Sequence, residues 1–91
     1  MFFEWDGRKE AENREKHGVS FREAATVLND PLSTTYPDLA HSESEQRYVT
    51  IGMSERGTIM VVAHSEEDDT VRIISARRAT RQERRFYEEE R

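Results

Sequence analysis

Arginine is concentrated in one short segment of the chain, between Arg72 and Tyr87. This segment holds six arginines and one acid, so its formal charge is +5, whereas the whole chain of 91 residues carries −5. A guanidinium group stays protonated near neutral pH and can donate two parallel hydrogen bonds to a phosphate or a carboxylate. The pattern therefore predicts a local anion-binding site on an otherwise acidic protein.

The remaining composition limits the chemistry available to such a site. The chain has no cysteine, which excludes disulfides and thiolate zinc sites. Its three histidines (His17, His41 and His64) show no spacing typical of metal ligands, so we expect neither a metal nor another cofactor. The longest apolar run, from Ile59 to Ala63, is too short to cross a bilayer, and the N-terminus does not resemble a signal peptide. A cytoplasmic protein without membrane contact is expected.

The N-terminal elements can be predicted from hydrophobic periodicity and capping residues. The sequence predicts a strand over Phe2 to Trp5, a helix over Gly7 to His17 that Asp6 caps, and a second helix over Phe21 to Leu28. Residues 31–46 contain two prolines and show no period. They are expected to form a loop that is long for so small a domain.

The C-terminal half predicts a sheet followed by a helix. Three strands are expected: Arg47 to Met53, Thr58 to Ser65 and Thr70 to Ala76. Short turns join them, which indicates an antiparallel meander with the middle segment at its centre. A capping box from Thr80 to Glu83 begins a final helix that extends to about Glu90. The prediction is one α+β domain over residues 1–91, in the order β-α-α-β-β-β-α, with both early helices on one face of an antiparallel sheet.

Alternation along the strands predicts a core face and an open face. The expected core face holds Val49, Ile51, Met53, Val71, Ile73 and Ser75. The expected open face holds Tyr48, Thr50, Arg72 and His64. Rings on an open face could stack a base while the neighbouring arginines hold phosphates. An ordinary solvated sheet face is the alternative interpretation.

Two groups of residues resemble the BrnT family of toxins. The N-terminal group is Trp5, Asp6, Lys9, Asn13, Lys16, His17, Gly18, Val19, Phe21, Glu23 and Ala24. The C-terminal group is the run from Arg72 to Ala79, followed by Glu83 and Tyr87. The resemblance covers nearly the whole chain. It implies a RelE-like fold and an endoribonuclease toxin of a type II toxin–antitoxin system, which inhibits translation and arrests growth.

The resemblance also implies partners and a reaction. A BrnA-type ribbon-helix-helix antitoxin is expected to neutralise the toxin in a 2:2 complex, and operator DNA is expected to bind only through the antitoxin. RelE-like toxins cleave RNA with its own 2′-OH as nucleophile and without a metal. Such a reaction needs a base, an acid and cations that stabilise the phosphorane charge.

Candidate residues for this chemistry lie at the arginine-rich corner or belong to the matched groups. The catalytic candidates are Arg72, Arg77, Arg78, His17, Glu83 and Tyr87. The RNA-binding candidates are Lys16, Arg47, Tyr48 and Arg81. Four of these residues can carry a proton: His17, Tyr48, Glu83 and Tyr87. His64 is a further candidate proton carrier.

Structural explanations exist for several candidates. Lys16 and His17 suit the C-terminus of a helix, Glu83 suits a capping box, and Tyr87 could pack the last helix on the sheet. Arg72, Arg77 and Arg78 are harder to explain in this way, because no acid in their own segment balances them. An alternative function remains for them: a protein-docking surface without catalytic activity, in a small regulatory module.

Overall fold

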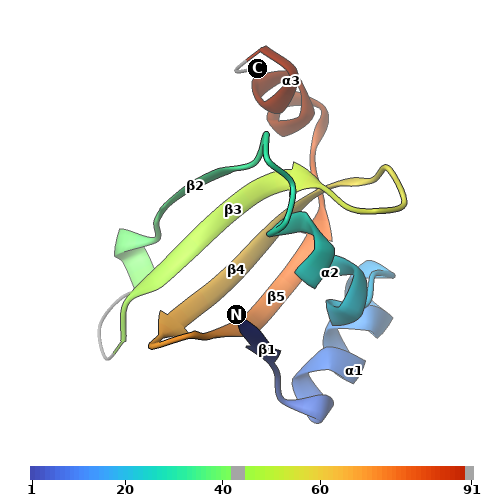
Figure 1. The fold of residues 1–91 in the computed structure, drawn as a ribbon. Coiled ribbons are helices and arrows are strands. Elements are labelled where there is room, and N and C mark those ends of the chain that lie inside the picture. Colours follow the sequence, from blue (N-terminus) through green and yellow to red (C-terminus); the bar gives the residue numbers. More distant parts are fainter. Residues whose placement is uncertain (42–44, 90–91) are drawn as a thin grey trace.

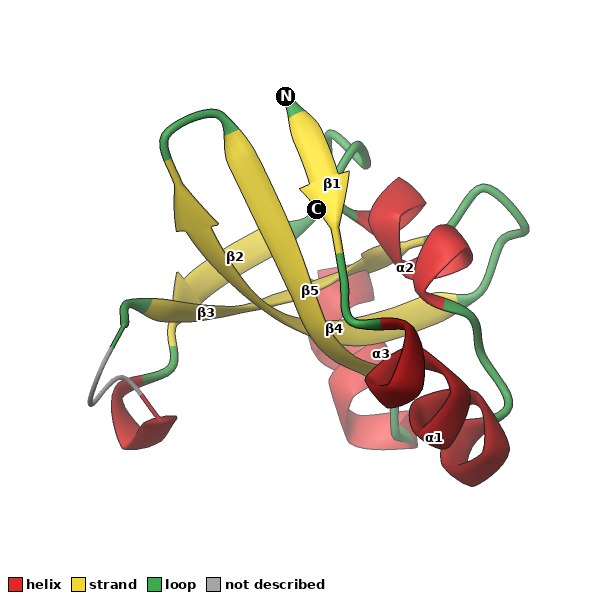
Figure 2. Ribbon diagram, turned by 90° about the horizontal axis from the view of Figure 1, so that it is seen from below, coloured by secondary structure: helices red, strands yellow, loops and turns green. Residues whose placement is uncertain are grey.

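Five strands form a single sheet in the order β1-β5-β4-β3-β2 (Figure 1). The structure, a computed structural model of the chain, describes residues 1–41 and 45–89. The strands are β1 (Phe2–Glu4), β2 (Thr34–Pro37), β3 (Arg47–Met53), β4 (Ile59–Glu67) and β5 (Thr70–Arg78). Neighbouring strands from β2 to β5 are antiparallel, whereas β1 lies alongside β5 and parallel to it (Figure 2).

Three α-helices and one 3-10 turn complete the fold: α1 (Gly7–His17), α2 (Phe21–Val27), η1 (Leu39–His41) and α3 (Arg81–Glu89). Asp6 caps α1 by accepting hydrogen bonds from the amides of Arg8 and Lys9, at 2.8 and 3.1 Å. Thr80 and Glu83 exchange the two reciprocal bonds of a capping box at the start of α3. None of the helices in the described ranges is long and apolar enough to span a membrane.

The predicted α+β fold and its order of elements are confirmed, with two differences in detail. The segment expected to be a loop contains β2, which the sequence conceals because it is four residues long, lies at a sheet edge and ends in Pro37. The sheet is mixed and not wholly antiparallel, because β1 pairs in parallel with β5. No tight turn joins these two strands, so nothing local forces them to be antiparallel.

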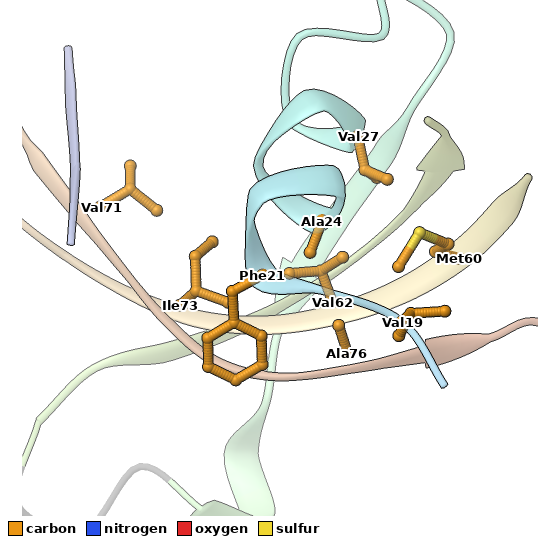
Figure 3. Packing of buried hydrophobic residues seen from close by; sticks show 9 residues of the cluster. All are labelled: Val19, Phe21, Ala24, Val27, Met60, Val62, Val71, Ile73 and Ala76. Atoms are coloured by element: carbon orange, nitrogen blue, oxygen red, sulfur yellow. The ribbon is translucent and has the colours of Figure 1, made fainter. Parts of the chain in front are cut away.

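The apolar core lies between the sheet and α2 (Figures 1 and 3), while α1 contributes no buried residue to it and packs along β5. Its members are Val19, Phe21, Ala24 and Val27 on the helix side, and Met60, Val62, Val71, Ile73 and Ala76 on β4 and β5. Phe21 is fully buried, and the ring of Trp5 meets it edge to face at 6.2 Å between centroids. This packing fixes the position of α1 relative to the end of β5.

On β3 and β4, the face that was predicted to be open is the face that packs on the helices, whereas Val71 and Ile73 of β5 lie in the core as predicted. Thr50 is 0% and His64 1% exposed, and both lie beside the core residue Val62. Tyr48 is half-buried opposite His64. The prediction was wrong because buried polar side chains can satisfy each other: the Thr50 hydroxyl and His64 Nε2 are 2.8 Å apart. Polarity alone therefore did not identify the solvent face.

A β-bulge in β5 also breaks the predicted alternation. Ile73 pairs with His64 and Ser75 pairs with Ala63, so Ile74 has no partner on β4. The extra residue turns Ala76 into the core and leaves Ser75 exposed, although Ser75 was predicted to face the core. Arg72, predicted to share a face with Tyr48, is exposed between two core residues and points to the opposite face.

Candidate active site

Arg78 lies at the corner where β5 ends against the C-terminus of α1. Its Nη1 donates a hydrogen bond to the carbonyl oxygen of His17 at 3.1 Å. Gly18 ends α1 with a φ of 73°, and a Cβ atom at Gly18 would lie 3.5 Å from the same Nη1. Glycine thus permits the left-handed turn, and the negative end of the helix dipole attracts the guanidinium. Arg78 is exposed, so its other N–H groups can reach a ligand.

Four more arginines from other elements surround this position. Arg84 of α3 lines the same surface depression as Arg78. A second depression, next to Gly18, is lined by Arg14, Arg22 and Arg56 together with the acids Glu23 and Glu55. We call Arg14, Arg22, Arg56, Arg78 and Arg84 the arginine corner. Four of them were not among the predicted site residues. Arg84 lies in the arginine-rich segment, whereas Arg14, Arg22 and Arg56 are brought to the corner by α1, α2 and the β3–β4 turn only in the folded chain.

Arg77 points away from this corner and forms an ion pair with Glu83. Its Nη1 and Nη2 donate to the two carboxylate oxygens of Glu83 at 2.7 and 2.9 Å. The hydrogen bonds from Arg77 lower the pKa of Glu83 to about 2, and the Thr80 amide adds to this effect. An acid therefore does balance Arg77, contrary to the prediction. The pair fastens α3 to the end of β5 and leaves Glu83 a weak base.

Tyr87 fastens the other end of α3. Its side chain is 2% exposed, and its hydroxyl donates to Asp30 Oδ2 at 2.6 Å. Asp30 also accepts hydrogen bonds from the amides of Leu32 and Met53. Tyr87 thus joins α3 to the loop after α2, and its burial separates the phenol from any ligand at the surface.

Lys16 and His17 occupy the last turn of α1, next to Arg78. Both line a shallow groove between α1 and β5, whose floor includes Ile74 and Ser75. Lys16 is exposed and His17 is half-buried. Arg81 is exposed in the first turn of α3. Of the predicted site residues, Arg78, His17 and Lys16 are therefore brought together.

The remaining candidates lie at the opposite end of the sheet. Arg47 and Arg72 flank Ser65 on neighbouring strands, and their partners are Glu45 and Glu4, each at 3.6 Å. Arg72 and Arg78 are six positions apart on β5, which corresponds to about 20 Å. Arg72 therefore does not join the arginine corner, although the sequence placed them in one cluster.

Tyr48 and His64 form a separate buried group at that end. Their rings stack with centroids 5.8 Å apart and an angle of 24°. His64 Nδ1 lies 3.4 Å from Glu66, and Thr50 connects His64 to the Thr35 hydroxyl at 2.6 Å. Burial lowers the pKa of His64, and the Glu66 charge opposes this shift. The group is a polar network on the core face in which His64 Nε2 is hydrogen-bonded and Nδ1 is buried without a hydrogen-bond partner among the described residues, and it presents no open platform for a base.

Within residues 1–41 and 45–89, no three His, Asp or Glu side chains are grouped so that they could hold a metal ion. The site in this part of the chain is built mainly from arginine, lysine and one histidine, and Glu23, Glu55 and Glu88 also line its two depressions.

Comparison with known proteins assigns the chain to a family. Residues 5–83 match the family described as ribonuclease toxin, BrnT, of type II toxin–antitoxin systems. The chain belongs to the BrnT family. The 1.1 Å crystal structure of the Brucella abortus ribonuclease toxin BrnT superposes with a TM-score of 0.69 and 22% identity, covering 89% of this chain and 100% of that chain. At 22% identity, this structural similarity shows that the two proteins share a fold. A search of curated proteins gave no match.

The BrnT match spans most of the elements that form the site. It begins at Trp5, which packs against Phe21, and ends at Glu83, which holds Arg77. It therefore includes α1, the turn at Gly18, strands β2 to β5 and the start of α3, and it ends one residue before Arg84. The resemblance predicted from the sequence is confirmed.

Proposed function

We propose that this BrnT-family chain is a metal-independent endoribonuclease whose active site is the arginine corner with His17. The observation that carries the proposal is the position of Arg78: its guanidinium is held by the carbonyl of His17, faces solvent and has further arginines around it. A fixed cation at a surface corner suits the extra negative charge that a phosphodiester gains during cleavage.

The proposed reaction uses the RNA's own 2′-OH. The 2′-oxygen attacks the adjacent phosphorus while the bond from phosphorus to the 5′-oxygen breaks, which gives a 2′,3′-cyclic phosphate and a 5′-OH end. Arg78 and Arg84 stabilise the phosphorane, and His17 transfers a proton to or from the reacting oxygens. Lys16 and Arg81 hold flanking phosphates.

Other predicted catalytic residues have positioning roles in this proposal. Glu83 is bound by Arg77 on both oxygens, so it is unavailable as a base, and Tyr87 is buried against Asp30. Arg77 orients α3, which carries Arg84 to the corner. Arg72, Arg47 and Tyr48 are too far from Arg78 to contact the same phosphate.

The partner of a type II toxin is an antitoxin, and we propose a BrnA-type ribbon-helix-helix protein in a 2:2 complex. An acidic segment of that partner would cover the arginine corner and imitate the RNA backbone, which blocks the site electrostatically. Operator DNA would be bound by the antitoxin, and the complex would act in the cytoplasm.

The decisive experiment measures cleavage of RNA in EDTA by the purified chain and by Arg78→Gln. The wild type should cleave and leave 2′,3′-cyclic or 3′-phosphate ends, because the 2′-OH route needs no metal-activated water. Loss of one donor to the developing charge should lower the rate by about 10²-fold. Arg85→Gln is the matched control, since Arg85 is also an exposed arginine but does not line the depression that contains Arg78 and Arg84.

Two results would contradict the proposal. A requirement for Mg²⁺ would exclude the metal-independent route. A folded wild type that neither cleaves RNA nor arrests growth when induced alone would favour the alternative, a docking module in which the arginines only bind acidic groups of a partner protein.

A further inference from the structure

The groove between α1 and β5 has an unusual composition for the place where a helix meets a sheet. Five side chains of α1 line it: Lys9, Glu12, Asn13, Lys16 and His17. Their spacing of i, i+3, i+4, i+7 and i+8 is that of a single helix face. On most surface helices the face nearest the sheet is apolar, and here it is polar and carries two lysines.

One contact explains part of this polarity. Asn13 donates to the carbonyl oxygen of Ala76 at 2.8 Å and accepts from the Ala76 amide at 3.2 Å, so it pairs with the edge of β5. The lysines have no such role. Neither Lys9 nor Lys16 has an ion pair with any residue in the described part of the chain. Glu12 is the single acid in the groove.

The groove is continuous with the arginine corner. His17 lines the groove and its carbonyl oxygen binds Arg78, so one end of the groove opens at the proposed cleavage site. The other end of the groove lies near Asp6, whose carboxylate accepts hydrogen bonds from the Lys9 and Arg8 amides. These hydrogen bonds lower the pKa of Asp6, and the charges of Lys9 and Arg72 add to this effect. Lys9 and Lys16 are seven residues apart on α1, or about 10 Å. This spacing is longer than the distance between successive phosphates of a single strand, and it suits two phosphates separated by a third.

We propose that the groove between α1 and β5 binds the backbone of a single-stranded RNA segment next to the cleaved bond, with Lys16 and Lys9 on two phosphates separated by a third. Lys9 was not among the residues predicted to bind RNA. The inference rests on the proposed ribonuclease function, and it assigns the direction in which the substrate leaves the arginine corner, along α1 from Lys16 toward Lys9. The shallow floor of Ile74 and Ser75 leaves the bases free to face solvent.

The test measures binding of a 2′-O-methyl RNA octamer of mixed sequence, which cannot be cleaved, across a series of KCl concentrations. A single-strand phosphate contact contributes about 0.7 to the slope of log affinity against log salt. We expect Lys9→Gln to lower the magnitude of this slope by about 0.7, and Lys9→Gln with Lys16→Gln to lower it by about 1.4. Arg8→Gln is the matched control, because Arg8 precedes Lys9 on the same helix and does not line the groove.

The outcomes separate this inference from the proposed function. An unchanged slope in the folded double variant, or an equal change in Arg8→Gln, would contradict RNA binding in the groove. If cleavage still depended on Arg78 in that case, the proposed ribonuclease function would remain supported. Loss of antitoxin binding with an unchanged RNA slope would show that the groove serves an acidic protein segment and would also overturn the inference. A wild type that fails to bind the octamer at low salt would overturn both.

Discussion

Arg77 and Arg78 are neighbours in the sequence and have different partners, because successive side chains of a strand point to opposite faces. Arg77 is bound by Glu83, and Arg78 lies on the last carbonyl oxygen of α1. Replacing Arg77 would release α3, so a loss of toxicity in that variant would not identify a catalytic group. Replacing Arg78 removes one bond at an exposed surface, and its effect on RNA cleavage can be interpreted directly.

A second single residue, His64, should make the free energy of unfolding depend on pH. Burial holds its folded pKa below the ordinary value of 6.5, so below that pH the unfolded chain gains a proton that the folded chain does not. The free energy of unfolding should therefore fall as pH decreases through 6.5, by up to about 1.4 kcal/mol per pH unit. Urea unfolding between pH 8 and 5 checks this, with His64→Gln as the reference. Parallel pH curves for the two proteins would show that His64 does not contribute.

Among the elements, those with long periodic patterns could be predicted and those shaped by tertiary contacts could not. The sequence defines α1 because Asp6 and Gly18 mark its ends, and it defines β4 because its residues are mostly apolar. It could not reveal the bulge at Ile74, which depends on the pairing of β4 with β5. The arginine corner was predicted only in part, since Arg14, Arg22 and Arg56 approach Arg78 through contacts between distant elements.

The contact between α1 and the edge of β5 should contribute to the stability of the fold. β1 pairs only with residues 70–72, and beyond them Asn13 of α1 takes the place of a neighbouring strand. Asn13→Ala would leave a partly buried amide and carbonyl unpaired and should destabilise the fold by about 1–3 kcal/mol. Asn13→Asp keeps the acceptor for the Ala76 amide but sets a carboxylate oxygen against the Ala76 carbonyl oxygen, so at neutral pH it should also destabilise the fold. Equal stability of wild type and Asn13→Ala in urea unfolding would contradict this account of the edge.

Over the whole molecule, opposite charges occupy opposite ends. The arginine corner lies near the β3–β4 turn, and the acidic run Glu66–Asp69 covers the end of β4 and the β4–β5 turn at the other end of the sheet. β4 separates them by about 25 Å. A chain with net charge −5 can therefore still offer RNA a positive approach, because salt screens charges beyond about 8 Å at physiological ionic strength.

Because the two ends are so far apart, the acidic end should have little effect on RNA affinity. Glu67→Gln with Asp68→Asn should change RNA affinity less than about twofold at 0.15 M salt, and more at 0.01 M, where the screening length is about 30 Å. Arg78→Gln should weaken binding at both salt concentrations. Fluorescence anisotropy with labelled RNA measures both effects, and a large gain in affinity for the acidic-end variant at 0.15 M would show that the two ends are coupled.

The contact between Arg78 and His17 joins residues 61 positions apart. Contacts of such separation form late, because the intervening chain must first be available. During synthesis α1 emerges long before β5, and until β5 has been made the helix has neither its edge partner at Ala76 nor the guanidinium at its end. The proposed site is therefore completed only after β5 has been made. Under the proposed function, a ribosome is not exposed to the nuclease of the chain that it is making before β5 has been translated.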